Sequence, residues 1–187
     1  MLRSAGPLLF GFAVLPVAAA ADLKVDNPGY DSWAKQKIGT VLIFTETQYF
    51  GGKKSEGTRE HTLKSIKPDE IRVESRYFSG GVETKDYRTE YPVFKTKIVS
   101  DKAGKDAALA PTAMCMPSGT EKLKIGAKSF DTKKFKKSEN VFGTDTITTY
   151  WVSTEVPGLR VKEETEEKIG GKFQKTKSLV FKELKTP

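Results

Sequence analysis

This sequence contains few of the residues from which catalytic and metal sites are usually built. Its 187 residues include one cysteine, Cys115, and one histidine, His61. A lone cysteine excludes an internal disulfide. The sequence also lacks a serine nucleophile elbow, a phosphate-binding glycine loop, and the CxxC and HExxH motifs. We therefore expect a non-enzymatic protein that needs no cofactor and no metal, with a hydrolase built from carboxylates distant in sequence as the alternative.

Long hydrophobic runs are also absent, except at the N-terminus. Arg3 precedes an apolar stretch from Leu8 to Val17, and four alanines at 18–21 follow it. This layout is typical of a secretory signal peptide, and the apolar stretch is shorter than the roughly 20 residues of a membrane-spanning helix. We predict that residues 1–21 are a signal peptide cleaved after Ala20 or Ala21. The protein is then exported, periplasmic or secreted, with no transmembrane segment after cleavage.

Residues 22–187 have the length of a single domain and the patterning of β-strands. From Ile71 to Tyr77, apolar and charged residues alternate, which predicts a strand with one packed side and one wet side. Glycine pairs at 51–52, 80–81 and 170–171 separate such runs, as does 140–145, and they favour tight hairpins. We predict a mainly β domain, an antiparallel meander forming a curved open half-barrel or a flattened barrel.

One short helix is expected before the first long strand. Asp26 or Asn27 is a suitable N-cap, and Pro28 follows at a position where its missing N–H costs nothing. We predict a helix over 28–37, in which Tyr30 and Trp33 share one face and pack against the sheet.

Residues 101–120 lack strand periodicity and contain Ala, Gly and Pro, which predicts a long loop. The loop includes Met114-Cys115-Met116, whose sulfur atoms are ligands suited to Cu(I). Neighbouring side chains on an extended segment point to opposite sides, however, so we favour packing at the sheet edge over a metal site. His61 stands in a polar stretch and is predicted to face solvent.

Charged residues of both signs are mixed along the chain, which has a formal net charge of +8. The exception is 122–137, where seven lysines accompany only Asp131. Phe130 and Phe135 are interleaved there, as on surfaces that bind single-stranded nucleic acid, but export argues against nucleic acid. An anionic envelope polymer or membrane headgroups are the expected partners, and a solvated strand pair is the simpler interpretation. The candidate polyanion-binding residues are Lys122, Lys124, Lys128, Lys133, Lys134, Lys136 and Lys137.

The segment from Trp151 to Glu164 reads W-V-S-T-E-V-P-G-L-R-V-K-E-E, and its Pro-Gly pair predicts a turn between two strands. It resembles the W-V-S-x-E-V-P-G-x-x-V-K-x-E signature of uncharacterised exported bacterial proteins. More distantly, it is similar to the periplasmic lipoprotein-carrier (LolA/LolB-like) superfamily. The second resemblance implies a curved half-barrel whose concave face is plugged by helices and holds acyl chains.

These observations lead to a leading functional expectation, with an envelope interaction module that binds anionic polymers or membrane headgroups through the lysine-rich segment as the alternative. An exported protein with a curved sheet, aromatic residues and no catalytic set is expected to hold an apolar or amphipathic, lipid-like ligand in its concave face. The candidate ligand-binding residues are Tyr30, Trp33, Tyr77 and Trp151.

Overall fold

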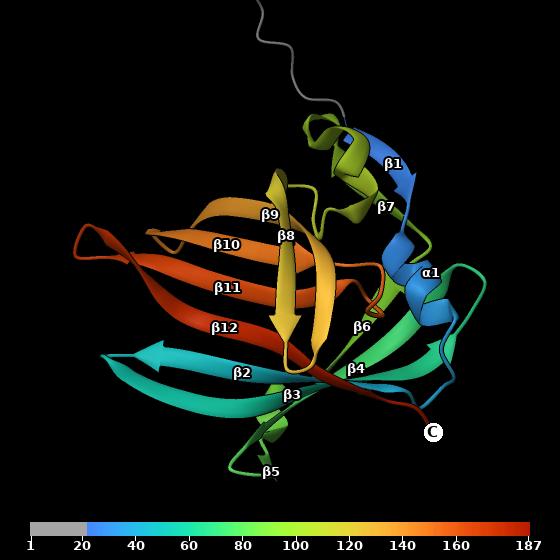
Figure 1. Ribbon diagram of the computed structural model, residues 1–187, viewed down its shortest axis with the longest axis horizontal. Helices are drawn as coiled ribbons and strands as arrows, with labels where there is room; N and C mark the ends of the chain where they lie inside the picture. The colour runs from blue at the N-terminus through green and yellow to red at the C-terminus, as the bar shows by residue number, and fades with distance from the viewer. Residues whose placement is uncertain (1–21) are drawn as a thin grey trace, which may run out of the picture.

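The computed structural model describes residues 22–187, so the predicted signal peptide lies outside the described residues. A large, curved antiparallel sheet dominates the molecule, and a small two-stranded sheet lies beside it (Figure 1). The elements are, in chain order, β1 (Asp22–Asp26), α1 (Pro28–Ala34), β2 (Val41–Phe50), β3 (Lys53–Ile66), β4 (Glu70–Ser79), β5 (Val82–Glu83), η1 (Lys85–Tyr87), β6 (Thr89–Phe94), β7 (Thr96–Ser100), η2 (Asp101–Leu109), β8 (Met116–Ile125), β9 (Lys128–Val141), β10 (Thr144–Val152), β11 (Arg160–Ile169) and β12 (Lys172–Lys185).

The large sheet confirms the predicted antiparallel meander. Its strand order is β5-β4-β3-β2-β12-β11-β10-β9-β8, and β6 also pairs with β4. Most neighbouring strands are consecutive in sequence. The exceptions are the pairing of β4 with β6, which passes over β5, and that of β2 with β12, which joins the first and last long strands. The sheet is not closed, because β8 at one edge pairs only with β9.

The predicted reversals at the glycine pairs and at 140–145 all form hairpins. In the β2–β3 turn, Gly51 and Gly52 have φ values of 55° and 76°, and in the β11–β12 turn Gly170 and Gly171 have 58° and 80°. Two successive positive φ values define the type I′ turn, which matches the twist of a hairpin. Glycine adopts this conformation without strain, so the paired glycines set the register of these hairpins.

The only α-helix within residues 22–187 is shorter than predicted, because α1 ends at Ala34 rather than at residue 37. Its start is as expected: the side chain of Asn27 accepts a hydrogen bond from the Gly29 N–H at 3.1 Å, and Pro28 is the first helical residue. Within residues 22–187, no helix combines the length and the apolar character needed to cross a membrane.

The predicted long loop at 101–120 is replaced at both ends by regular structure. The 3-10 segment η2 occupies Asp101–Leu109, and strand β8 begins at Met116. The strand was missed because it is an exposed edge strand whose pairing with β9 shifts between Pro117 and Gly119, so it has no regular apolar period.

The main core lies between α1 and the sheet. Trp33 of α1 is 2% exposed and belongs to one cluster with Leu42, Phe44 and residues of β4, β9, β11 and β12. Phe181 of β12 packs edge-on against both Phe44 and Phe130, with ring centroids 6.0 and 5.7 Å apart. These aromatic contacts fill much of the concave side with side chains.

Candidate functional site

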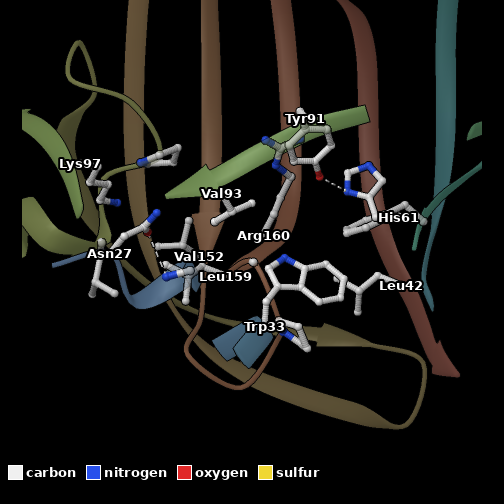
Figure 2. Close-up of a pocket in the computed structure, with 16 residues that line it drawn as sticks. Asn27, Trp33, Leu42, His61, Tyr91, Val93, Lys97, Val152, Leu159 and Arg160 are labelled. Carbon is white, nitrogen blue, oxygen red and sulfur yellow. Dashed lines mark hydrogen bonds between the residues drawn. The ribbon is translucent and has the colours of Figure 1, made fainter. Parts of the chain in front are cut away.

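A groove remains open on the side of the sheet that faces α1 and β6. Cross-strand pairing places Leu42 of β2 beside His61 of β3, and Val73 of β4 beside Tyr91 of β6, so these side chains share one side. Two cavities of about 180 and 400 Å³ lie there, and both are lined by His61, Tyr91 and Arg160. We call these two cavities together the inner groove, and Figure 2 shows the smaller one.

The turn between β10 and β11 builds one wall of the inner groove. The Gly158 N–H donates to Ser32 Oγ of α1 at 2.9 Å. A Cβ at Gly158 would lie 2.8 Å from Trp33 Nε1, and this residue has a φ of 72°. The turn therefore requires glycine both for its conformation and for its contact with the helix. It fixes the Trp33 ring in the wall and starts β11 at Arg160.

Arg160 is a partly exposed cation that lines both cavities of the inner groove. Its guanidinium lies 3.0 Å from Glu163 Oε2 and 5.8 Å from the centre of the Tyr150 ring. The side chain is 37% exposed, and it lines the smaller cavity together with Tyr91 and Val93 (Figure 2). A ligand entering the groove can reach this guanidinium.

Two further cations, Arg59 and Lys177, line the larger cavity. Both pair with Glu46, which is 1% exposed: Arg59 Nε contacts Glu46 Oε2, and Lys177 Nζ lies 3.8 Å from Oε1. Burial raises the pKa of Glu46, but its hydrogen bonds with Arg59 and Gln48 and the charge of Lys177 outweigh this effect and lower the pKa overall. One buried carboxylate thus faces two cations.

Lys97 of β7 stands in the smaller cavity. Its Nζ donates to the backbone carbonyl of Ala110 at 2.7 Å. Burial lowers its pKa to about 8, so it is still mainly protonated at neutral pH. The inner groove therefore carries more positive than negative charge.

His61 and Tyr91 form an uncharged polar pair in the middle of the groove. His61 Nδ1 and the Tyr91 hydroxyl are 2.9 Å apart, and the imidazole packs against Phe44 with ring centroids at 5.1 Å. Burial, reinforced by Arg160 and Arg59, lowers the pKa of His61 to about 3. Burial raises the pKa of Tyr91 to about 12. The prediction that His61 faces solvent is wrong, because the side of β3 that carries it faces a polar groove instead of water.

The four aromatic candidates do not gather at one place. Trp33 lines the inner groove. Tyr30 is buried behind it and donates to the Lys67 carbonyl at 2.7 Å. Tyr77 is buried with the Arg59 guanidinium 5.4 Å from its ring.

Trp151 lies on the other side of β10. Its neighbours Tyr150 and Val152 belong to the cluster beside the groove, and successive strand residues point to opposite sides. The Trp151 ring lies between Lys134 and Lys162, whose Nζ atoms are 5.2 and 4.4 Å from its centre, and its Nε1 donates to Glu121 at 2.9 Å.

The seven candidate lysines lie along the β8–β9 hairpin without forming one continuous face. Lys122 and Lys124 are on β8, and the other five, Lys128, Lys133, Lys134, Lys136 and Lys137, are on β9. Three pair with carboxylates: Lys133 with Asp106, Lys134 with Glu121 at 3.2 Å, and Lys137 with Glu139 at 2.6 Å. Binding of a polyanion by this hairpin stays a prediction.

Cys115 is buried in a cluster with Phe135 and Tyr150, while Met114 and Met116 are exposed. The three sulfur side chains therefore do not converge. Within residues 22–187, no group of three or more His, Cys, Asp or Glu side chains is arranged to hold a metal ion.

Comparison with known proteins supports the fold and no more. No family model and no curated protein matches the sequence. A solved structure from Bacteroides fragilis NCTC 9343, of a protein regarded as exported and having a YmcC-like fold, matches with a TM-score of 0.55 and 12% identity. The match covers 81% of this chain and 97% of that one. The architecture therefore recurs in a protein of very different sequence.

Proposed function

We propose that this protein is an exported, non-enzymatic binding protein whose inner groove holds a small amphipathic anion. The position of Arg160 carries the proposal. Its guanidinium lines both cavities, keeps 37% of its side chain exposed, and contacts a single carboxylate, Glu163, among the described residues. Hydrogen bonds from a guanidinium to an anionic ligand are among the strongest that a protein makes.

The remaining charges favour an anion over a cation. Lys97, Arg59 and Lys177 add positive charge along the groove, against the buried Glu46 and the partly buried Glu163. The His61–Tyr91 pair supplies uncharged polar atoms between them. An anion that enters the groove is attracted by these cations and does not have to displace Glu46 or Glu163 from its ion pair.

The walls favour an apolar part on the same ligand. Trp33, Leu42, Val93 and Leu159 line the smaller cavity. Binding sites for small molecules usually have about 300–1,000 Å³, whereas the two cavities measure about 180 and 400 Å³. A buried cluster that includes Phe44, Phe130 and Phe181 already fills much of the concave side. The volume of the cavities therefore favours a ligand with a short acyl chain over one with a long chain. This restricts the class of lipid-like ligands expected from the sequence.

Export is supported by two observations outside the groove. Residues 1–21 have the three-part layout of a signal peptide. The structural neighbour from Bacteroides fragilis is itself regarded as exported. Both agree with a protein that meets its ligand outside the cytoplasm.

Calorimetric titration of the chain spanning residues 22–187 with octanoate tests the groove. We expect saturable binding of octanoate and much weaker binding of octylammonium, which has the same chain length and the opposite charge. Arg160→Gln should weaken octanoate binding at least tenfold, because it removes a charged hydrogen-bond donor worth about 1.5–3 kcal/mol.

Arg76→Gln is the matched control, because Arg76 pairs with Glu60 at 2.9 Å and lines neither cavity. This variant should bind octanoate as the parent protein does. Absence of saturable octanoate binding, or equal binding of octylammonium, would contradict the proposal.

A further inference from the structure

Three hairpin turns carry exposed apolar side chains at one end of the large sheet. The β9–β10, β11–β12 and β2–β3 hairpins are neighbours in an antiparallel sheet, so their turns lie at the same end, at the left of Figure 1. We call the exposed apolar residues of these turns the tip rim. They are Phe50, Val141, Phe142, Ile169 and Phe173.

The exposure of the tip rim exceeds what isolated surface residues usually show. Phe50 is 89% exposed and Phe142 is 104% exposed, so both rings extend fully into solvent. Single exposed apolar residues are common on protein surfaces. Here, however, they recur at each of three adjacent turns, which makes them a feature of this end of the molecule.

Phe142 also occupies a conformation that is unfavourable for a bulky residue. Its φ is 49°, at the turn position where the other two hairpins have Gly51 and Gly170, with φ values of 55° and 58°. A phenylalanine in the left-handed region is strained, and a fully exposed ring gains no packing in return. Backbone strain that no contact within the fold offsets indicates that the residue has a functional role, such as contact with another molecule.

Unpaired lysines stand directly opposite two of these residues. Cross-strand pairing puts Lys53 opposite Phe50 and Lys172 opposite Ile169. Among the residues whose side chains the structure describes, neither lysine has a carboxylate within 4 Å. The nearby acids Glu56 and Asp145 are already paired with Lys54 and Lys168. Within the turns themselves, at 50–53, 141–144 and 169–172, these two lysines are the only charged residues, and Glu166 and Glu167 lie further along β11.

We propose that the tip rim docks the protein on an anionic lipid bilayer, with its aromatic rings entering the boundary between headgroups and acyl chains. Glycines beside the rings leave open space, since no atom lies within 4 Å of a Cβ built at Gly51, Gly143 or Gly170. The exposed rings therefore protrude from the turns with open space beside them. A fluid surface accepts separate rings, and its anionic headgroups attract the flanking lysines.

Vesicle sedimentation of the chain spanning residues 22–187 tests this docking, since the predicted signal peptide would itself bind lipid. We expect binding to vesicles of phosphatidylglycerol and phosphatidylcholine, and weaker binding to phosphatidylcholine alone. The combined variant Phe50→Ser, Phe142→Gly, Phe173→Ser should bind at least tenfold more weakly. Lys53→Gln and Lys172→Gln should each weaken binding roughly fivefold, and only on the anionic vesicles.

Phe94→Ser is the matched control, because Phe94 is an exposed phenylalanine of β6 whose strand end lies beside α1, with the Lys95 carbonyl bonded to the Asn27 N–H. It should leave vesicle binding unchanged. In addition, a tryptophan placed by Phe142→Trp should shift its emission to shorter wavelength when anionic vesicles are added.

Several results would overturn the proposal. These are no sedimentation of the parent protein with either vesicle, equal binding of the parent and the combined variant, or equal binding to both vesicle types. Ultracentrifugation without lipid gives a further outcome: a dimer that the combined variant abolishes would assign the tip rim to a second copy of the chain and would refute lipid docking.

Discussion

The two ends of the large sheet use glycine in different ways. At the α1 end, Gly158 has a positive φ and also approaches the Trp33 ring so closely that a Cβ would lie 2.8 Å from Nε1. At the tip end, Gly51 and Gly170 have positive φ values but open space around them. The end that carries the inner groove is therefore fixed by tertiary packing, whereas the tip end is fixed by local turn conformation and is free to carry exposed residues.

The largest expected difference between the two ends is in the free energy of unfolding after a glycine in a turn is replaced by alanine. Gly158→Ala should lower the free energy of unfolding by about 3 kcal/mol, because it combines left-handed strain of about 1–2 kcal/mol with displacement of a buried ring. Gly170→Ala at the tip end should cost only the strain, about 1 kcal/mol. Urea unfolding measures both, and equal losses would show that the β10–β11 turn does not depend on its contact with α1.

Acid should destabilise the protein at pH values above those at which most carboxylates are protonated. The pKa of His61 is about 3 in the folded protein, against 6.5 for the unfolded chain. The unfolded state therefore binds more protons between these values, and the stabilisation present above pH 6.5 is lost as the pH falls. Between pH 6.5 and 5 the expected loss is about 2 kcal/mol.

The sequence makes this measurement specific, because His61 is the only histidine and carboxylates titrate mainly below pH 5. In His61→Gln, the free energy of unfolding should change little over the same interval. A parent protein that is equally stable at pH 6.5 and 5 would show that His61 is accessible to protons in the folded state.

The two ends also differ in how much of them the sequence predicts. The tip end follows from local patterns: the glycine pairs and the alternating residues between them give the hairpins and their register. The capping of α1 by Asn27 and Pro28 is local as well. Because these features depend on neighbouring residues only, a single sequence is enough to place them.

The inner groove depends on pairings that no local pattern contains. His61 and Arg160 line the same cavities because β2 pairs with β12 and β11 follows in the sheet. The stretch around His61 has polar residues on both sides of its strand. Such a pattern is typical of a strand that faces solvent, and a strand that lines a polar groove has the same pattern. The Pro157-Gly158 pair is a local signal for the turn that positions Arg160. It does not reveal that this turn packs against α1.

At the groove itself, Lys97 should make anion binding depend on pH. Its pKa of about 8 means that it loses its charge between pH 7 and 9, while Tyr91, with a pKa of about 12, stays neutral. Octanoate binding should therefore weaken about fivefold over this interval, as expected for one partly screened charge worth about 1 kcal/mol. Lys97→Met should bind about fivefold more weakly at pH 7 and show little change up to pH 9.

The smallest expected effect has the opposite sign and concerns the tip end. Phe142→Gly gives the β9–β10 turn the same pair of glycines as the β2–β3 and β11–β12 turns. Relief of left-handed strain, about 1–2 kcal/mol, exceeds the added backbone entropy of glycine in the unfolded chain, about 0.5–1 kcal/mol. The free energy of unfolding should therefore rise by about 0.5 kcal/mol.

Asn140 Oδ1, which accepts a hydrogen bond from the Gly143 N–H at 2.9 Å, keeps the turn in place. A variant that unfolds more easily than the parent would mean that the Phe142 ring contributes to the fold, and the contrast between a packed end and a free end would no longer hold at this turn.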